Sequence, residues 1–244
     1  ALVIEGAREN NLKNATVSIP LGLLVGVSGV SGSGKSTLVE KTLYQNWLRA
    51  VGRPTESPGE CNAFRGADLI GEMVLVDQRP IGRTPRANLL TYTKALDPLR
   101  NLLAQTPEAR ARGLTTKHFS FNVPGGRCER CNGEGYEHVE MQFLADVFIR
   151  CPQCDGRRFK EEILDIRARG LSIGDMLQST AKELMERFSD QEPVLRTLRP
   201  ITAIGLDYIE LGQPLSTLSG GEAQRLKLIR HLRETNRSEE HTSE

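Results

Sequence analysis

Several stretches of the chain have a hydrophobic pattern that predicts a defined element. Residues 23–28, "LLVGVS", form a short apolar run that predicts a strand, and a glycine-rich turn follows it. An amphipathic helix is expected to begin near Lys35. A second apolar run, Met73 to Asp77, predicts another core strand. With an antiparallel β portion expected near the N-terminus, these patterns favour an α/β fold.

Two further patterns lie in the second half of the chain. Residues 135–150, "GYEHVEMQFLADVFIR", alternate well enough to predict a β-hairpin. Further along, a serine and two glycines precede a segment whose apolar side chains recur at helical spacing. This segment is therefore expected to be an amphipathic helix, with an apolar face made by Leu226, Leu228, Ile229 and Leu232.

The overall composition changes this picture little. The chain is 38% hydrophobic with a formal net charge of +1, so total charge predicts neither nucleic-acid nor membrane binding. No apolar run approaches the roughly 20 residues of a membrane helix, and we expect a soluble, cytoplasmic protein with no membrane partner. Charge is uneven, however: residues 79–118 hold eight basic and two acidic side chains. That segment is either a solvated surface or a face that meets a polyanion.

The glycine-rich turn after residues 23–28 fills the pattern G-x-x-x-x-G-K-[ST]. Glycines let the backbone wrap closely around phosphate oxygens, and the helix N-terminus adds partial positive charge. The lysine is expected to reach the β- and γ-phosphates of ATP, and the serine hydroxyl to bind Mg²⁺. The alternative is a chance glycine-rich turn between a strand and a helix. The predicted ATP-binding residues of this loop are Gly29, Gly32, Gly34, Lys35, Ser36 and Thr37.

The acid at the end of the second apolar run has two interpretations. Asp77 could be a Mg²⁺-binding aspartate, but the next residue is Gln78, which cannot act as a general base. The interpretation that we favour is a core strand that brings Gln78 near the γ-phosphate, with Asp77 as a structural acid.

Four cysteines lie in two pairs, Cys128-x-x-Cys131 and Cys151-x-x-Cys154, separated by nineteen residues. This spacing is typical of structural Zn²⁺ sites, in which four thiolates leave no position open for water. Gly133 and Gly156, two positions after each pair, are expected to shape the turns around the metal. Disulfides and free core thiols are the alternatives, and an intracellular setting disfavours the first. Cys61 is expected to be an ordinary thiol outside this site, and His118 and His138 to be surface residues.

The motifs occur in an order that resembles the ABC ATPase superfamily. The phosphate loop comes first, the glutamine follows, and "LSGGEAQR" looks like the signature motif, whose anion-binding residues are Ser219, Gly220 and Gly221. The strings "GARENNLKN", "FSFNVPGGRCERCNGEGY", "CPQCDGRRF" and "GLDYIELGQPLSTLSGGEAQR" narrow the resemblance to the C-terminal half of the UvrA family. These are the ATPase subunits of the bacterial excision-repair nuclease.

This resemblance implies a function in DNA repair. UvrA-type proteins carry two ABC domains in one chain, form homodimers, bind double-stranded DNA and load a UvrB-type partner subunit at lesions. It implies that the phosphate loop binds ATP and Mg²⁺, that Gln78 senses the γ-phosphate, and that the signature loop closes over a nucleotide on another ABC domain. It also implies a zinc module near DNA, with Arg127 and Lys160 as candidate phosphate contacts.

The sequence departs from the family pattern after the signature helix. An apolar strand ending in Asp-Glu and then a switch histidine are expected there and do not occur, and His231 and His241 are out of place for the switch. Residues 237–244, "RSEEHTSE", look like one reading frame of a sequencing-library adapter, which predicts a truncated chain. Alone, it is expected to bind nucleotide without efficient hydrolysis. A transport or translation ABC ATPase, a non-hydrolysing binding module and a UvrA-like drug-resistance protein are the alternatives.

These motifs predict a linear organisation of five parts. An ABC-type P-loop core is expected first, then a basic helical segment, an inserted zinc module, a helical signature region and the adapter-like tail. Their predicted bounds are 1–80, 81–123, 124–160, 161–236 and 237–244.

Overall fold

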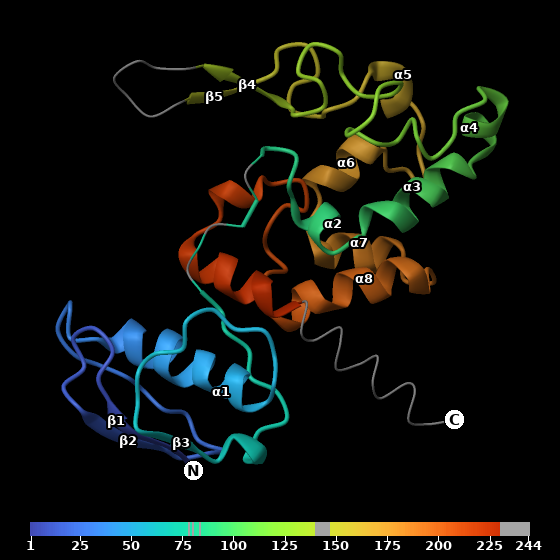
Figure 1. Ribbon diagram of the computed structural model, residues 1–244. Coiled ribbons are helices and arrows are strands. Elements are labelled where there is room, and N and C mark those ends of the chain that lie inside the picture. The colour runs from blue at the N-terminus through green and yellow to red at the C-terminus, as the bar shows by residue number, and fades with distance from the viewer. Residues whose placement is uncertain (78, 80, 83, 140–146, 230–244) are drawn as a thin grey trace. The chain divides into compact units, whose positions relative to one another are not determined.

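The computed structural model describes the chain except for residues 78, 80, 83, 140–146 and 230–244. It divides into two compact units, Ala1–Leu75 and Val76–Glu244. Figure 1 shows that the first unit combines a sheet with one long helical segment, whereas the second consists mainly of helices and loops.

The first unit is built on a three-stranded antiparallel sheet. β1 (Leu2–Ala7) lies between β2 (Ala15–Ile19) and β3 (Ala63–Arg65), which confirms the antiparallel β portion expected near the N-terminus. Alternate residues of β1 point to one face, where Leu2 and Ile4 are buried.

The helical segment of the first unit begins at the phosphate loop, as predicted. Residues 35–36 are helical, η1 (Thr37–Tyr44) continues with π-helical turns, and α1 (Gln45–Ala50) completes the segment. The segment packs against β1 and buries Trp47 completely. A single 3-10 turn, η2 (Ala67–Leu69), follows β3.

Neither of the two predicted core strands forms. Residues 23–28 and 73–77 have no strand structure, and Leu24 is fully exposed. Buried strands of an α/β sheet need hydrogen-bonding neighbours and helices on both faces. In the described part of the chain, no segment pairs with either run. The two runs are apolar, but the prediction that they form strands is wrong for this chain.

The second unit is a helical assembly with one hydrophobic core. Its helices are α2 (Leu89–Tyr92), α3 (Leu96–Ala104), α4 (Pro107–Ala111), α5 (Glu161–Leu164), α6 (Ile173–Gln178), α7 (Ala181–Arg187) and α8 (Glu192–Ala203), followed by η3 (Leu215–Thr217) and helical residues 220–229. The core runs from Leu89 to Ile229 and includes residues on both sides of the cysteine-containing loops.

Local sequence signals define several of these helices. Ser172 and Asp175 form a reciprocal capping box at the start of α6, and Thr180 and Glu183 form another at α7. α7 and α8 pack against each other. The signature helix buries Leu226 and Ile229 as predicted, but Leu228 is exposed because it lies on the opposite side of the helix. Leu232 lies outside the described residues.

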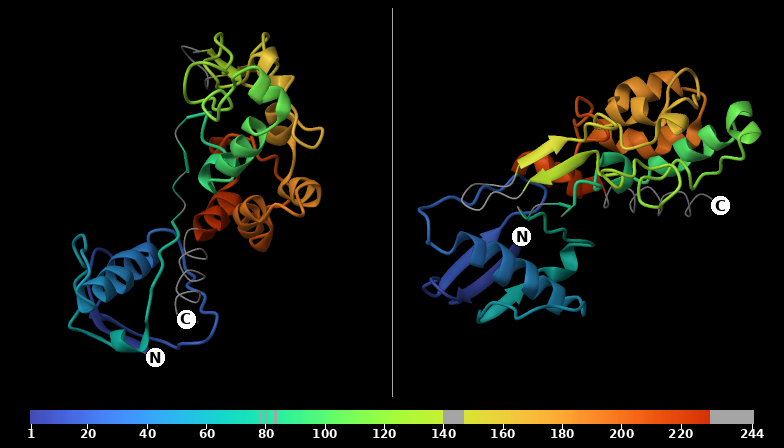
Figure 2. Two further views of the ribbon diagram at one scale, coloured as in Figure 1. Left: turned by 90° about the vertical axis from the view of Figure 1, so that its right-hand side faces the viewer. Right: turned by 90° about the horizontal axis from the view of Figure 1, so that it is seen from above.

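The predicted hairpin is present. β4 (Tyr136–Val139) pairs antiparallel with β5 (Val147–Arg150), and the two strands lie side by side in Figure 1 and in the right view of Figure 2. At the base of the cysteine-containing loops, Phe121 and Phe159 are buried and meet edge to face, with ring centroids 6.1 Å apart. This aromatic pair anchors the loops in the helical core.

Candidate metal centre and nucleotide-binding segments

The phosphate loop forms a closed, exposed turn. Lys35 Nζ donates hydrogen bonds to the carbonyl oxygens of Gly29 (2.8 Å) and Val30 (2.7 Å), so the side chain folds over its own loop. Gly32 and Gly34 have positive φ angles of 80° and 96°, a conformation that glycine adopts without a steric penalty. Glycine therefore stands where the backbone of this turn requires a positive φ angle. A phosphate group that approached Lys35 would compete with two neutral carbonyl groups for its ammonium group.

The segment between β1 and β2 supports this loop, and sequence reasoning did not assign it a role. Asn11 Nδ2 donates to the carbonyl of Gly32 (2.8 Å), and Asn10 Nδ2 lies 3.4 Å from Thr37 Oγ1. A Cβ at Gly34 would come within 2.9 Å of Leu12 Cδ2. The asparagine pair in "ENNLK" was the available signal, because side-chain amides often hold loop carbonyls.

The signature segment forms the N-terminus of the helical residues 220–229. Ser219 Oγ accepts from the Glu222 backbone N–H (3.3 Å), and Glu222 Oε2 accepts from the Ser219 backbone N–H (2.7 Å). This reciprocal pair is a capping box. In the described part of the chain, no atom outside the local backbone lies within 4 Å of a Cβ built on Gly220 or Gly221, so the backbone there is open to an approaching group. Tyr208 Oη donates to Glu222 (2.6 Å) and fixes the cap from the side.

Asp77 is held by the signature helix. Lys227 forms an ion pair with its carboxylate and donates to the carbonyl oxygens of Asp77 (2.8 Å) and Arg79 (2.7 Å). The Lys227 hydrogen bond holds the pKa of Asp77 below its usual value, so this carboxylate is charged. Such an arrangement agrees with a structural role for Asp77. Gln78, the predicted γ-phosphate sensor, lies outside the described residues.

The four predicted cysteine ligands come together in one buried cluster. The Sγ atoms of Cys128, Cys131, Cys151 and Cys154 all lie within 4.8 Å of one another. Cys128 and Cys151 Sγ are 3.9 Å apart, and Cys131 and Cys154 Sγ are 3.7 Å apart. A tetrahedral zinc site with Zn–S bonds of about 2.3 Å places its sulfurs about 3.8 Å apart. The cluster therefore fits Zn²⁺, and its spacings are too long for disulfides.

The surroundings of the sulfurs also suit a metal. Gly133 and Gly156 have positive φ angles of 83° and 78°, which shapes the two turns. The Gly135 backbone N–H donates to Cys131 Sγ (3.3 Å), an interaction that favours a thiolate. Burial nevertheless raises the pKa of Cys131 and of Cys154, so protons would leave the cluster when a cation binds.

Histidines do not contribute to this cluster among the described residues. His118 is half-buried, and its Nδ1 accepts a hydrogen bond from the Thr115 backbone N–H (2.9 Å). The side chain of His138 is outside the described part of the structure. Cys61 is half-buried in the first unit, as expected for an ordinary thiol.

The two candidate DNA contacts lie on neighbouring backbone segments of the zinc module. Arg127 pairs with Phe159 in an isolated β-bridge, and the Lys160 backbone N–H donates to Gly126 O (2.9 Å). Lys160 forms an ion pair with Glu129 (2.5 Å), and Arg127 donates to Asn132 Oδ1 (3.2 Å). The backbones of these two residues thus lie on adjacent segments, and each side chain has a partner within the protein.

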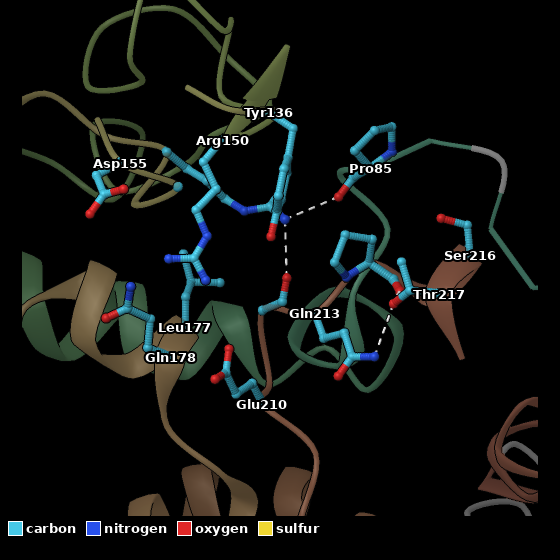
Figure 3. Close-up of a pocket in the computed structure, with 14 residues that line it drawn as sticks. Pro85, Tyr136, Arg150, Asp155, Leu177, Gln178, Glu210, Gln213, Ser216 and Thr217 are labelled. Carbon is cyan, nitrogen blue, oxygen red and sulfur yellow. Dashed lines mark hydrogen bonds between the residues drawn. The ribbon is translucent and has the colours of Figure 1, made fainter. Parts of the chain in front are cut away.

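A cavity of about 420 Å³ lies between the zinc module and the segment that leads into the signature loop. Figure 3 shows Tyr136 and Arg150 from the module facing Glu210, Gln213 and Thr217 from that segment. Gln213 Nε2 donates to Thr217 Oγ1 (2.9 Å). The module and the signature region therefore enclose this space together within the second unit.

The phosphate loop, the signature segment and the cysteine cluster define an ABC-type ATPase fold with an inserted four-cysteine module compatible with zinc. No protein-family model matches the sequence. Curated relatives do: "UvrABC system protein A" of Methanothermobacter thermautotrophicus is 50% identical over 231 residues, and that of Thermus thermophilus is 48% identical over 231 residues. Each match covers 95% of this chain and 24% of the relative. The resemblance to UvrA is confirmed.

A solved structure agrees with the sequence matches. The chain is similar to UvrA2 from Deinococcus radiodurans with a TM-score of 0.82 and 45% identity, over 96% of this chain and 28% of that one. The chain thus spans about a quarter of the length of the curated relatives that it matches. Within the described residues, no helix is long and apolar enough to cross a membrane.

Proposed function

We propose that this chain is an ATP-binding part of a DNA-damage recognition ATPase that works in nucleotide excision repair. The observation that carries the proposal is the match of 48–50% identity to UvrABC system protein A over 95% of the chain. The relatives' name supports a DNA repair ATPase of the UvrABC system. Binding of double-stranded DNA, homodimer formation by the longer protein and loading of a UvrB-type partner are parts of this proposal.

The phosphate loop would hold ATP through its backbone N–H groups and Lys35. Lys35 would exchange the carbonyls of Gly29 and Val30 for the β- and γ-phosphate oxygens, and Ser36 would bind Mg²⁺. Bound Mg²⁺ would supply charge neutralisation for phosphoryl transfer. Thr37 and the remaining loop glycines would complete the cradle, and Gln78 would sense the γ-phosphate.

The signature loop would act on a nucleotide held by another ABC domain. The open backbone at Gly220 and Gly221, at the start of a helix, is suited to bind an anion together with Ser219. Because such a site needs two domains and a carboxylate base, we propose that this chain alone binds nucleotide and turns it over poorly.

The zinc module would provide a rigid surface near DNA. The four cysteines would hold Zn²⁺ with no ligand position open, so the metal would stabilise the fold of residues 124–160. Arg127 and Lys160, which lie on neighbouring segments, would exchange their internal partners for phosphate oxygens of the duplex.

The experiment that tests the proposal measures binding of a fluorescent ATP analogue with Mg²⁺ to the 244-residue chain. Lys35→Ala should weaken binding at least about tenfold, because a charge-assisted contact to phosphate is lost. Lys41→Ala is the matched control, since it removes the same charge from an exposed position in the same helical segment. Equal affinity of the Lys35→Ala variant and the wild-type chain would refute the assignment of the phosphate loop.

A further inference from the structure

Arg158 is a buried cation with no carboxylate partner among the described residues. Its side chain is only 2% exposed, although arginine is rarely buried so deeply without a counter-ion. Glu134, a carboxylate whose charge acts on Arg158, forms an ion pair with Arg86 instead (3.4 Å). The guanidinium stacks over the Phe121 ring, 5.2 Å from the ring centroid. A buried charge in this state needs negative charge from elsewhere.

The hydrogen bonds of Arg158 connect the zinc module to two loops of the helical region. Its Nη2 donates to the carbonyl oxygens of Pro85 (3.1 Å) and Gly212 (3.0 Å). Its Nη1 is buried without a hydrogen-bond partner in the described structure. Gly212 begins the segment that leads to the signature loop at Ser219. The side chain therefore spans the distance between the two regions.

The same residue is in contact with the turns that carry the cysteines. Its carbonyl accepts from the Cys128 backbone N–H (2.8 Å), and its own backbone N–H interacts with the sulfur of Cys154. A Cβ at Gly135 would lie 3.1 Å from Arg158 Cγ and 3.5 Å from Nε, and the Gly135 N–H donates to Cys131. Four thiolates and one Zn²⁺ would sum to a charge of −2, which is the missing counter-charge.

We propose that Arg158 is a positioning residue that balances the negative charge of the zinc–tetrathiolate centre and ties that centre to the loops at Pro85 and Gly212. This inference rests on the proposed zinc site. Metal binding would then also hold the Arg158 guanidinium in position, in addition to stabilising the fold of the module. The guanidinium in turn holds the start of residues 212–217 through its hydrogen bond to Gly212. The zinc centre and the signature region are thereby coupled through one side chain.

The first test compares the zinc affinity of 244-residue chains by competition with a chromogenic chelator. Arg158→Gln should weaken zinc binding about 10- to 100-fold, the usual effect of removing an outer-shell partner of a metal site. Arg130→Gln is the matched control, because Arg130 also interacts with the charges of the cysteines but is 52% exposed. Water screens its charge, so the control should keep nearly the wild-type affinity. An equal loss in both variants, or no loss in either, would overturn the inference.

The Arg158→Lys variant distinguishes the effect of the positive charge from the effect of the hydrogen bonds to Pro85 and Gly212. It also replaces the glutamine variant as the test if that variant does not fold. Lysine keeps the positive charge but lacks the planar fork that reaches two carbonyls. It should bind zinc better than Arg158→Gln, while hydrogen exchange of residues 212–217 becomes faster than in the zinc-loaded wild-type chain. Unchanged exchange in this segment would show that Arg158 does not couple the two regions. A wild-type chain that binds less than one zinc ion would instead refute the zinc site itself.

Discussion

The cysteine cluster and the phosphate loop differ in how completely this chain forms them. The cluster is closed and buried, and its sulfur spacings already suit a tetrahedral metal. The phosphate loop forms a turn with Gly32 and Gly34 at positive φ angles, but the apolar run before it, residues 23–28, is exposed and without strand structure. All parts of the cluster lie within residues 128–154, whereas a buried strand needs neighbours from distant segments. A site whose ligands lie close together in the sequence is therefore formed more completely here than one that depends on pairing between distant segments.

The largest effect is expected from a substitution that removes one ligand of the cysteine cluster. Cys131→Ser should remove the bound zinc and unfold residues 124–160, because structural zinc contributes on the order of 10 kcal/mol to small metal-dependent folds. The measurement is zinc content per chain together with hydrogen exchange across the module. Cys61→Ser is the control, since Cys61 lies outside the cluster and should leave zinc content unchanged. Retention of one zinc ion by the Cys131→Ser chain would contradict a four-thiolate site.

The sequence could predict those features whose determinants lie close together in the chain. The cysteine spacing, the hairpin at residues 135–150 and the start of the helix at Lys35 each depend on a few neighbouring residues, and the structure contains them. The prediction of strands at residues 23–28 and 73–77 is wrong because an apolar pattern indicates that a segment tends to be buried, but not whether another strand pairs with it.

Other features could not be predicted from local sequence patterns, because they depend on contacts between residues far apart in the chain. The contact of Asn11 with the phosphate loop spans 21 residues, and the ion pair of Lys227 with Asp77 spans 150 residues. The sequence does not predict a role for Arg158, since an arginine beside a cysteine motif is normally a surface residue. Only the folded chain shows that its guanidinium is buried and reaches Pro85 and Gly212.

A smaller effect is expected on the unfolding free energy of the first unit, where a buried strand residue can be compared with an exposed residue of the run 23–28. Ile4→Ala should destabilise the first unit by about 2–5 kcal/mol, because Ile4 is fully buried in β1. Leu24→Ala should change its stability by less than about 0.5 kcal/mol, because Leu24 is fully exposed. The chain has one tryptophan, Trp47, which lies in this unit, so its fluorescence during urea unfolding reports on this unit alone. Equal losses for the two variants would show that residues 23–28 are buried after all.

The smallest expected effect is a difference in zinc affinity between alanine variants of the two glycine turns in the cysteine cluster. Gly133 and Gly156 have similar positive φ angles, so alanine at either position should cost about 1–2 kcal/mol in backbone strain. At Gly133 the new Cβ would also come 2.3 Å from the carbonyl oxygen of Phe121, whereas at Gly156 the nearest atom would be 3.9 Å away, in the flexible side chain of Arg150. The first collision involves backbone, which cannot move aside without shifting Phe121 out of the core.

Gly133→Ala should therefore weaken zinc binding more than Gly156→Ala, by a further factor of about ten for each 1.4 kcal/mol of added strain. Chelator competition on the two variants measures this difference directly, because backbone conformation is common to both and only the collision differs. If both variants lose the same affinity, the turn after Cys131 is not packed against Phe121 as the structure has it. In that case this turn does not transmit strain to the helical core, and the link from the metal to the rest of the second unit depends on other contacts, such as the hydrogen bonds of Arg158 and the ion pair between Arg86 and Glu134.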